Sequence, residues 1–173
     1  HETCDLRKPL FKVIKKLFHY NVTYMQDRFI IINSRPIAEF LVKIGFGGTA
    51  QTKRIPEWVF GLPIKQKLAF LGGYFDSDGH TSSNGIYITS INKSLLEGVR
   101  ELALACGIGF SRIFNHSEEK RTIILGKDCQ RRRSYRILLN GKNAVNVKTR
   151  SEFRKKEFKK IQTRRNYSTC GGW

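Results

Sequence analysis

Two aspartates, Asp76 and Asp78, lie two positions apart in the segment LGGYFDSDG. The residues before them, from Lys65 to Phe75, have apolar side chains at helical spacing, so both carboxylates are predicted at the C-terminal end of a helix. The negative end of a helix dipole disfavours carboxylates, and a divalent cation would compensate for their charge. The pair therefore predicts a metal site. The alternative is that an aspartate simply ends the helix before Gly79.

The same expected helix contains two adjacent glycines, Gly72 and Gly73, directly after Leu71. A glycine inside a helix costs up to about 1 kcal/mol relative to alanine, so two in succession need a physical reason. Close approach of another backbone is the usual one. These three residues therefore predict a tight helix–helix contact.

Two familiar motifs for cations and phosphates do not fit. A calcium-binding loop that began at Asp76 would need Gly and Glu where Thr81 and Tyr87 stand. A phosphate-binding loop needs Ser or Thr after its Gly-Lys, and neither Gly126-Lys127 nor Gly141-Lys142 has one.

The chain of 173 residues has 32 Lys and Arg against 14 Asp and Glu, a formal net charge of +18. Its 40% hydrophobic residues indicate a folded protein rather than a solvated basic tail. A polyanion would relieve the self-repulsion, so nucleic acid is the first partner to consider and an anionic membrane surface the second. Lys or Arg interrupts every apolar run within about ten positions, so no membrane-spanning helix is expected. Four scattered cysteines favour reduced thiols in an intracellular protein, in a compartment left open.

Helices alternate with short strands in the expected fold, which places the chain in the α+β class. Apolar periodicity predicts helices at 10–20, 37–46, 65–75 and 93–106, the second capped by Ser34 and the fourth by Asn92. Alternating or β-branched runs predict strands within 21–32, 79–90, 110–117 and 131–140, with Asn84-Gly85 as a hairpin turn. RTIILG is either a further strand or an excursion.

The two halves have a similar order of elements, and DRFIIINSRPI and SYRILLNGKNA share one pattern. This similarity predicts two pseudo-repeats, of which the first is incomplete, although a match this short can also arise by chance. We expect the C-terminal part of a first unit at 1–50, a linker at 51–64, a second unit at 65–149 and a basic C-terminal segment at 150–173.

The nonapeptide LGGYFDSDG resembles the namesake motif of the LAGLIDADG, or DOD-type, homing endonucleases. It is identical at five positions and has small residues at Gly72 and Ser77 in place of alanine; the identical residues are Leu71, Gly73, Asp76, Asp78 and Gly79. The lead-in KRIPEWVF, with Leu62-Pro63 after it, is similar to the linker of the intein-borne branch. The resemblance extends from Asp27 to Lys142.

This resemblance implies αββαββα units with saddle-shaped antiparallel sheets, paired through their motif helices, that cleave double-stranded DNA at specific sites. It implies Mg²⁺ or Mn²⁺ held by Asp78, with Asp76 and the Ser77 carbonyl as further candidates, although Asp76 would rather serve the helix end. The family also places a basic catalytic residue nearby. Lys142 is the first candidate and Lys127 the second, and the alternative for Lys142 is an ordinary solvated lysine.

Such sheets read DNA through alternate side chains in the major groove. About half of the candidate readers are expected to touch phosphate or water instead of bases. The candidates on the first hairpin are His80, Ser82, Ser83, Tyr87 and Thr89, and those on later strands are Arg112, Asn115, Lys127, Arg131, Arg133 and Arg136. Lys155 and Lys159 in the basic C-terminal segment are expected to bind the DNA backbone, or else to form an ordinary solvated face.

Only one such motif is present, whereas a monomeric member needs two. The other would lie upstream of His1, come from a second copy through homodimerisation, or come from a partner. A cleavage-inactive relative, acting as an RNA maturase or a sequence-specific DNA-binding module, is the alternative function.

Overall fold

The computed structural model describes residues 6–25, 29–82, 85–109 and 111–140, together with 149, 155, 156 and 159. Its helices are α1 (Arg7–Phe18), α2 (Arg35–Lys43), α3 (Glu57–Phe60), α4 (Ile64–Asp78) and α5 (Lys93–Leu104). Its strands are β1 (Thr23–Met25), β2 (Phe29–Ile31), β3 (Gly79–Ser82), β4 (Gly85–Ser90), β5 (Phe114–Ser117), β6 (Lys120–Ile124), β7 (Lys127–Arg131) and β8 (Ser134–Asn140). The mixed α+β class with antiparallel sheets is confirmed.

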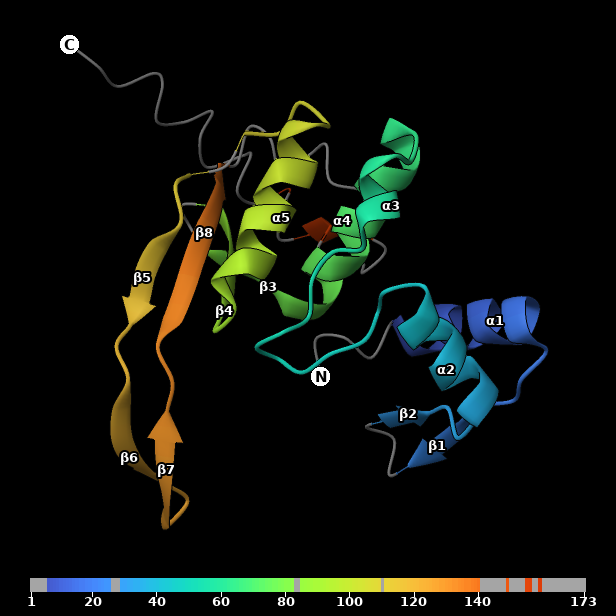
Figure 1. Cartoon of the computed structure of the whole chain (residues 1–173), viewed down its shortest axis with the longest axis horizontal. Coiled ribbons are helices and arrows are strands. Elements are labelled where there is room, and N and C mark those ends of the chain that lie inside the picture. Colours follow the sequence, from blue (N-terminus) through green and yellow to red (C-terminus); the bar gives the residue numbers. More distant parts are fainter. Residues whose placement is uncertain are drawn as a thin grey trace.

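The N-terminal part consists of α1, the hairpin β1–β2 and α2 (Figure 1). The predicted cap of α2 is confirmed, because the Ser34 hydroxyl accepts a hydrogen bond of 3.5 Å from the Ile37 amide. The Phe18 ring meets the Phe40 ring edge-on at 5.9 Å. Ile37 is buried, but Leu17 and Val42 remain exposed, so this part covers only some of its apolar side chains.

A four-stranded antiparallel sheet of order β3-β4-β8-β5 forms the centre of the C-terminal part. Helices α4 and α5 pack on one face of this sheet (Figure 1). Side chains alternate between the two faces of a strand. Those beneath the helices are fully or almost fully buried, and they include Ile86, Ile88, Ile137 and Leu139. The opposite face carries the intervening residues of the same strands, which include Tyr87, Thr89 and Arg136.

Strands β6 and β7 form a separate two-stranded hairpin inserted between β5 and β8. The RTIILG segment is therefore a strand that belongs to an excursion, and it does not join the main sheet. Figure 1 shows this hairpin extending away from α4 and α5, beyond the end of β8. We call residues 118–133, which include the hairpin, the arm.

The connector between α2 and α3 is folded, although its sequence is rich in glycine and polar residues. The Trp58 indole Nε1 donates a hydrogen bond of 2.7 Å to the Ile44 carbonyl. Phe46 meets Trp58 edge-on at 5.9 Å and stacks on Phe70 of α4 at 6.1 Å. These aromatic contacts hold the connector against α4 and bring its Lys53 to the end of that helix.

Candidate acid site and nucleic-acid interface

Helix α4 ends at Asp78, and the chain enters β3 at the next residue, Gly79. The Gly79 amide donates to the Phe75 carbonyl, which closes the last turn of the helix. A Cβ on Gly79 would lie 2.5 Å from that carbonyl oxygen, so only glycine fits at this junction. The abrupt change from helix to strand leaves the Asp78 side chain 44% exposed at the helix end.

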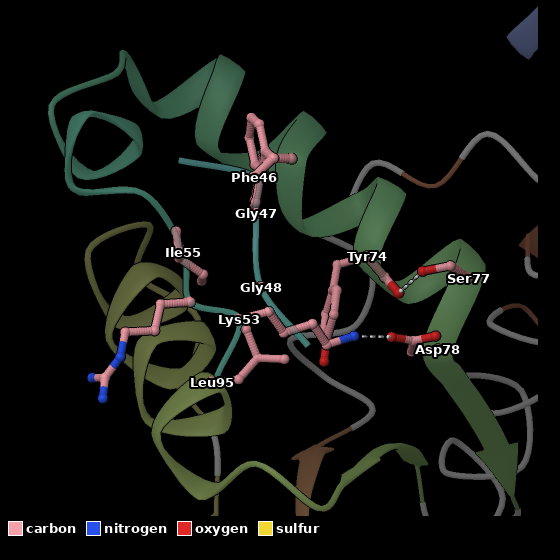
Figure 2. A pocket seen from close by; sticks show the side chains of 11 residues that line it. Phe46, Gly47, Gly48, Lys53, Ile55, Tyr74, Ser77, Asp78 and Leu95 are labelled. Atoms are coloured by element: carbon pink, nitrogen blue, oxygen red, sulfur yellow. Dashed lines mark hydrogen bonds and ion pairs between the residues drawn. The ribbon is translucent and has the colours of Figure 1, made fainter. Parts of the chain in front are cut away.

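Lys53 of the connector faces the Asp78 carboxylate. Its Nζ lies 4.0 Å from Asp78 Oδ2, and both side chains are partly exposed (Figure 2). Lys53 was not among the site residues predicted from the sequence. The available signal was its place in KRIPEWVF, the lead-in whose resemblance to the family linker was noted. The base that lies beside Asp78 therefore comes from upstream of the motif helix.

Two sets of contacts fix the backbone at Lys53. Its amide donates to the Thr49 carbonyl at 2.9 Å, which closes a turn that starts after Gly48. Gly48 has φ +100°, and a Cβ there would press on the Lys53 backbone at 3.2 Å. On the other side, Asn92 Nδ2 donates to the Lys53 carbonyl at 2.7 Å, while Asn92 Oδ1 caps α5 by accepting from the Leu95 amide at 3.0 Å.

A pocket of about 280 Å³ opens beside this ion pair. Phe46, Ile55 and Leu95 give it apolar walls, and the polar groups of Lys53, Tyr74, Ser77 and Asp78 lie together at one side (Figure 2). Burial, and secondly the Asp78 charge, raise the pKa of the Tyr74 phenol far above its usual value. Tyr74 therefore keeps its proton at neutral pH and is a hydrogen-bonding group, not a base.

Asp76 does not join Asp78. Its residue is only 4% exposed, whereas Asp78 is open to solvent. Because α4 continues through Asp78, the two aspartates are two helical positions apart, and side chains at that spacing do not face each other. The helix-end role considered for Asp76 agrees with its burial, and a shared metal site of the two acids stays a prediction.

Ser77 lies between the two aspartates and lines the pocket. Its hydroxyl donates to the Tyr74 carbonyl at 3.0 Å, so the hydroxyl is engaged within the helix. Its own carbonyl is in the last turn of α4, and the residue that would be its helical partner is already in β3. Ser77 therefore has a backbone oxygen at the end of α4, one residue before Asp78.

The oxygen ligands at this site could supply part of the coordination shell of Mg²⁺. Mg²⁺ prefers oxygen ligands and often uses only one or two carboxylates, with water and substrate phosphate oxygens as its other ligands. Asp78 supplies such a carboxylate. Within the described ranges, no group of three or more His, Cys, Asp or Glu side chains is placed to hold a metal. A site built on Asp78 would thus take its remaining ligands from elsewhere.

Of the two lysines predicted beside the acids, the structure describes only Lys127. Lys142 lies outside the described residues, as does Ser83. Lys127 is described and begins β7, next to the turn of the arm and far from the end of α4 (Figure 1). It therefore does not supply the base beside Asp78 in this fold.

The residues predicted to form a helix interface divide into two groups. Leu71 and Gly72 are buried, and the Leu71 side chain belongs to the core beneath the sheet. Gly73 is exposed, and a Cβ built on it would meet no described atom within 4 Å. The Leu71 side chain therefore packs within this part of the chain. Gly73 lies on an open face of α4.

Four of the predicted DNA-reading residues come together on the open face of the sheet. The imidazole of His80 stacks on the Tyr87 ring with centroids 6.4 Å apart, and the Arg136 guanidinium lies 5.0 Å above the same ring. Arg136 Nε donates to Thr89 Oγ1 at 2.9 Å. Pairing of His80 with Tyr87 and of Thr89 with Arg136 in the β-ladder explains why distant parts of the sequence meet here.

His116 completes this cluster, and sequence reasoning missed it. Its Nε2 lies 2.7 Å from Arg136 Nη2. Desolvation, then the charges of Arg136 and Arg131, lower the pKa of His116 below its ordinary value. A neutral ring can accept a hydrogen bond from the guanidinium through Nε2. We call His80, Tyr87, Thr89, His116 and Arg136 the polar face.

The remaining predicted DNA contacts are more scattered. Asn115 pairs with Tyr135, which lies on the helix-covered side of the sheet, so the register separates Asn115 from the polar face. Arg133 forms an ion pair of 2.8 Å with Glu118. For Ser82 the structure describes the strand position alone. The other predicted bases whose side chains are exposed are Arg112, Lys127, Arg131, Lys155 and Lys159.

Known proteins share part of this sequence. A protein from Mycobacterium leprae named for the iron–sulfur cluster assembly SufBD family is 39% identical over 99 residues, which are 56% of this chain and 11% of that protein. A DNA polymerase of Thermococcus hydrothermalis is 36% identical over 86 residues, 47% of this chain and 5% of the polymerase. The RNA polymerase subunit Rpo1C of Methanocaldococcus jannaschii is 36% identical over 81 residues, 46% of this chain and 9% of the subunit. The chain thus spans about a tenth or less of these relatives.

None of the described helices is long and apolar enough to span a membrane. The family model for the LAGLIDADG-like domain matches residues 65–161. The match includes α4 with its acid, the four-stranded sheet, α5 and the arm, and it covers more than half of the chain. On this evidence the chain belongs to the LAGLIDADG-like domain family.

Proposed function

We propose that this chain is part of a homing endonuclease that cuts both strands of DNA at specific sites with a divalent metal ion. The observation that carries the proposal is the position of Asp78. Its carboxylate is exposed at the end of the motif helix, beside Lys53 and a pocket that Ser77 also lines, on the same domain as the polar face. A nuclease of this family needs one acid per strand cut, held next to a DNA-reading surface.

The polar face would read the DNA sequence. An antiparallel β-ribbon fits the major groove, where side chains of one strand face meet base edges. Arg136 is the strongest candidate because its bonds to Thr89 and His116 and its stacking on Tyr87 fix its plane. A guanidinium has five N–H donors, and these two bonds use two of them. The remaining three suffice for a bidentate contact with guanine.

Magnesium or manganese, when bound, would activate the attacking water and stabilise the leaving oxygen. Asp78 would hold this ion, and the Ser77 carbonyl is close enough in sequence to assist. The ammonium of Lys53 would neutralise charge on the scissile phosphate, because it already lies beside the carboxylate that must approach that phosphate. Tyr74, which stays protonated, can donate a hydrogen bond to a phosphate oxygen at the pocket.

The second acid would come from another LAGLIDADG helix packed on α4. The open position of Gly73 supports this part of the proposal, because a second helix could approach there without a side chain in the way. The partner helix would belong to an upstream unit of the same protein, to a second copy, or to a partner. The division into a first unit at 1–50 and a second at 65–149 remains a prediction.

We also infer that the chain comes from an intein-borne member. Relatives named for iron–sulfur cluster assembly, DNA polymerisation and RNA polymerisation each share only a short stretch with this chain. A segment common to proteins with such different names behaves as an insertion and not as a part of each protein's own activity. The lead-in KRIPEWVF, which forms part of the packed connector and of α3, supports the same origin.

A cleavage-inactive DNA-binding module or RNA maturase is the second candidate, and one observation favours it. Asp78 is the sole exposed acid of the motif in the described chain, and it pairs with a lysine. Selection from a random duplex library with Mg²⁺, followed by sequencing of bound and of cut fragments, separates the two functions. The endonuclease proposal predicts that the cut fragments end at one shared sequence. Enrichment of bound fragments without cut ends would favour the module.

A further inference from the structure

The turn at the tip of the arm has an unfavourable sequence for its shape. Leu125 and Gly126 form a two-residue loop between Ile124 and Lys127, and both have positive φ, 51° and 75°. Hairpin loops of this kind favour Asn-Gly or Asp-Gly, because asparagine and aspartate tolerate the left-handed conformation. Leucine adopts that conformation only at an energetic cost. Besides Gly residues, only His19 and Leu125 have positive φ in the described chain.

The same leucine is also the most exposed large apolar residue of the described chain. Leu125 is 97% exposed, and Ile123 beside it is 76% exposed. Both the left-handed backbone conformation and the exposure of the apolar side chain make Leu125 unfavourable for the stability of the fold. Stability therefore does not explain why a leucine occupies this position. Strained positions that persist in a fold often serve a function.

Charge identifies the kind of partner that this tip fits. The arm contains more bases than acids, and two of its three acids are already in ion pairs: Glu118 with Arg133 at 2.8 Å and Asp128 with Arg121 at 3.8 Å. The third, Glu119, accepts a hydrogen bond from Gln130. Bases of the arm without a carboxylate partner among the described residues include Lys127, Arg131 and Arg132. An apolar tip on a basic stem fits a polyanion with an apolar interior, which is a nucleic acid duplex.

The length of the arm relates its tip to the grooves of such a duplex. Strand β6 has five residues and therefore spans about 17 Å beyond the four-stranded sheet. That distance equals about five base pairs at 3.4 Å each. Half a helical turn from a major groove, the same side of B-DNA presents its minor groove. When the sheet lies in the major groove with the arm along the duplex, the tip meets the next minor groove.

We propose that Leu125, supported by Ile123, is a wedge that the arm inserts between two base pairs from the minor groove, which unstacks that step and bends the DNA. Proteins that bend DNA in this way combine apolar wedges with basic residues that hold the flanking phosphates. Lys127, the first residue after the turn, lies next to the tip for that purpose. The inference rests on the proposed DNA binding but not on cleavage. It adds a base-pair step at which the protein would recognise the deformability of the DNA.

The test uses the whole chain and the duplex selected from the random library. A series of duplexes carries 2-aminopurine, whose fluorescence rises when it unstacks, at each position of the flanking five base pairs. Wild type should raise the fluorescence several-fold at one or two adjacent positions. Leu125→Asn should abolish this rise and reduce the bend measured by circular permutation. Because asparagine suits the turn, Leu125→Asn should also melt at a higher temperature, so that its loss of effect cannot reflect unfolding.

Two further variants serve as controls. Leu104→Gln removes an exposed leucine at the end of α5 and should leave the fluorescence and the bend unchanged. Lys127→Gln should weaken binding and reduce the salt dependence by about one counterion, with the fluorescence at saturation preserved. If Leu125→Asn produced the same fluorescence rise and the same DNA bend as wild type, the wedge would be overturned, although the proposed DNA binding would still hold. If wild type without DNA formed a dimer and Leu125→Asn were a monomer, the tip would instead be a protein–protein contact, and the wedge would be overturned. Failure of wild type to bind any duplex would remove the proposed function as well.

Discussion

Asn92 connects the helix that it caps to the segment that carries Lys53. Its side-chain oxygen accepts from the Leu95 amide at 3.0 Å, and its side-chain nitrogen donates to the Lys53 carbonyl at 2.7 Å. One buried amide thereby joins the start of α5 to the connector. The position of Lys53 opposite Asp78 thus depends on a residue that belongs to neither the motif helix nor the connector.

Asn92→Ala should lower the free energy of unfolding by about 2 kcal/mol, because it removes a helix cap and leaves a carbonyl without its donor. Asn92→Ser keeps a capping oxygen but is too short to replace the bond to Lys53, so it should lose about half as much. Denaturant unfolding followed by circular dichroism measures both. Equal stability of wild type and Asn92→Ala would show that this link does not hold the connector.

Lys53→Met should raise the affinity of the site for Mn²⁺, because an ammonium beside Asp78 repels a cation. The pair is partly exposed, so the effect should not exceed about 1 kcal/mol, or a factor of about five in Kd. Titration of free Mn²⁺ by electron paramagnetic resonance measures it. Lys65→Met is the matched control. Lys65 lies at the other end of α4 from Asp78, so this variant should leave the Kd for Mn²⁺ unchanged. A lower affinity for Mn²⁺ in Lys53→Met than in wild type would contradict the repulsion between the Lys53 ammonium and the bound cation.

Gly73→Ala should have opposite effects on the isolated chain and on its assembly. A Cβ at Gly73 meets no described atom, so alanine should raise the free energy of unfolding by about 0.5–1 kcal/mol through helix propensity. The same methyl group would hold a second motif helix away from α4. Calorimetry and sedimentation on target DNA measure the two effects. A variant that is more stable and assembles as well as wild type would show that Gly73 is not a helix contact.

The pH dependence of stability should include a contribution from His116. Its pKa in the folded chain is lowered, so the unfolded chain binds the proton first as the pH falls. This contribution is full above about pH 6.5, the unfolded value, and declines below it until the folded pKa is passed. Arg136→Gln should raise the His116 midpoint, and Arg131→Gln should raise it less, because Arg136 is the larger of these two causes. Nuclear magnetic resonance of the imidazole protons measures the midpoints, and an unchanged midpoint in Arg136→Gln would refute the contact.

Much of the fold was predictable because it depends on local patterns. The four predicted helices, the cap by Ser34 and the cap by Asn92 follow from apolar periodicity and capping chemistry, and all are confirmed, whereas the short α3 was not predicted. The helix predicted at 65–75 is three residues longer at its end, since Asp76 is buried and continues the helix. Burial of an acid cannot be deduced from spacing alone, so the different surroundings of Asp76 and Asp78 could not be predicted from the sequence.

The site itself was predictable only in part, because its remaining members meet through tertiary contacts. Lys53 reaches Asp78 by means of aromatic packing of the connector on α4. His116 reaches Arg136 through the pairing of β5 with β8, across the insertion of a whole hairpin. Residues 110–140 gave no local signal for which strand joins the main sheet, so four residues of the polar face could be predicted as a list but not as a cluster, and His116 could not be predicted.

The most direct test of the account is the rate at which a plasmid carrying the selected target is cut in Mg²⁺ by wild type and by Asp78→Asn. Loss of the ligand that positions the metal should slow cleavage at least about 100-fold, with DNA affinity preserved. Asp128→Asn, which removes an acid of the arm that pairs with Arg121, should cut at nearly the wild-type rate. Cleavage by Asp78→Asn at the wild-type rate, or specific binding by wild type without any cleavage, would contradict the central claim that Asp78 makes this chain a nuclease.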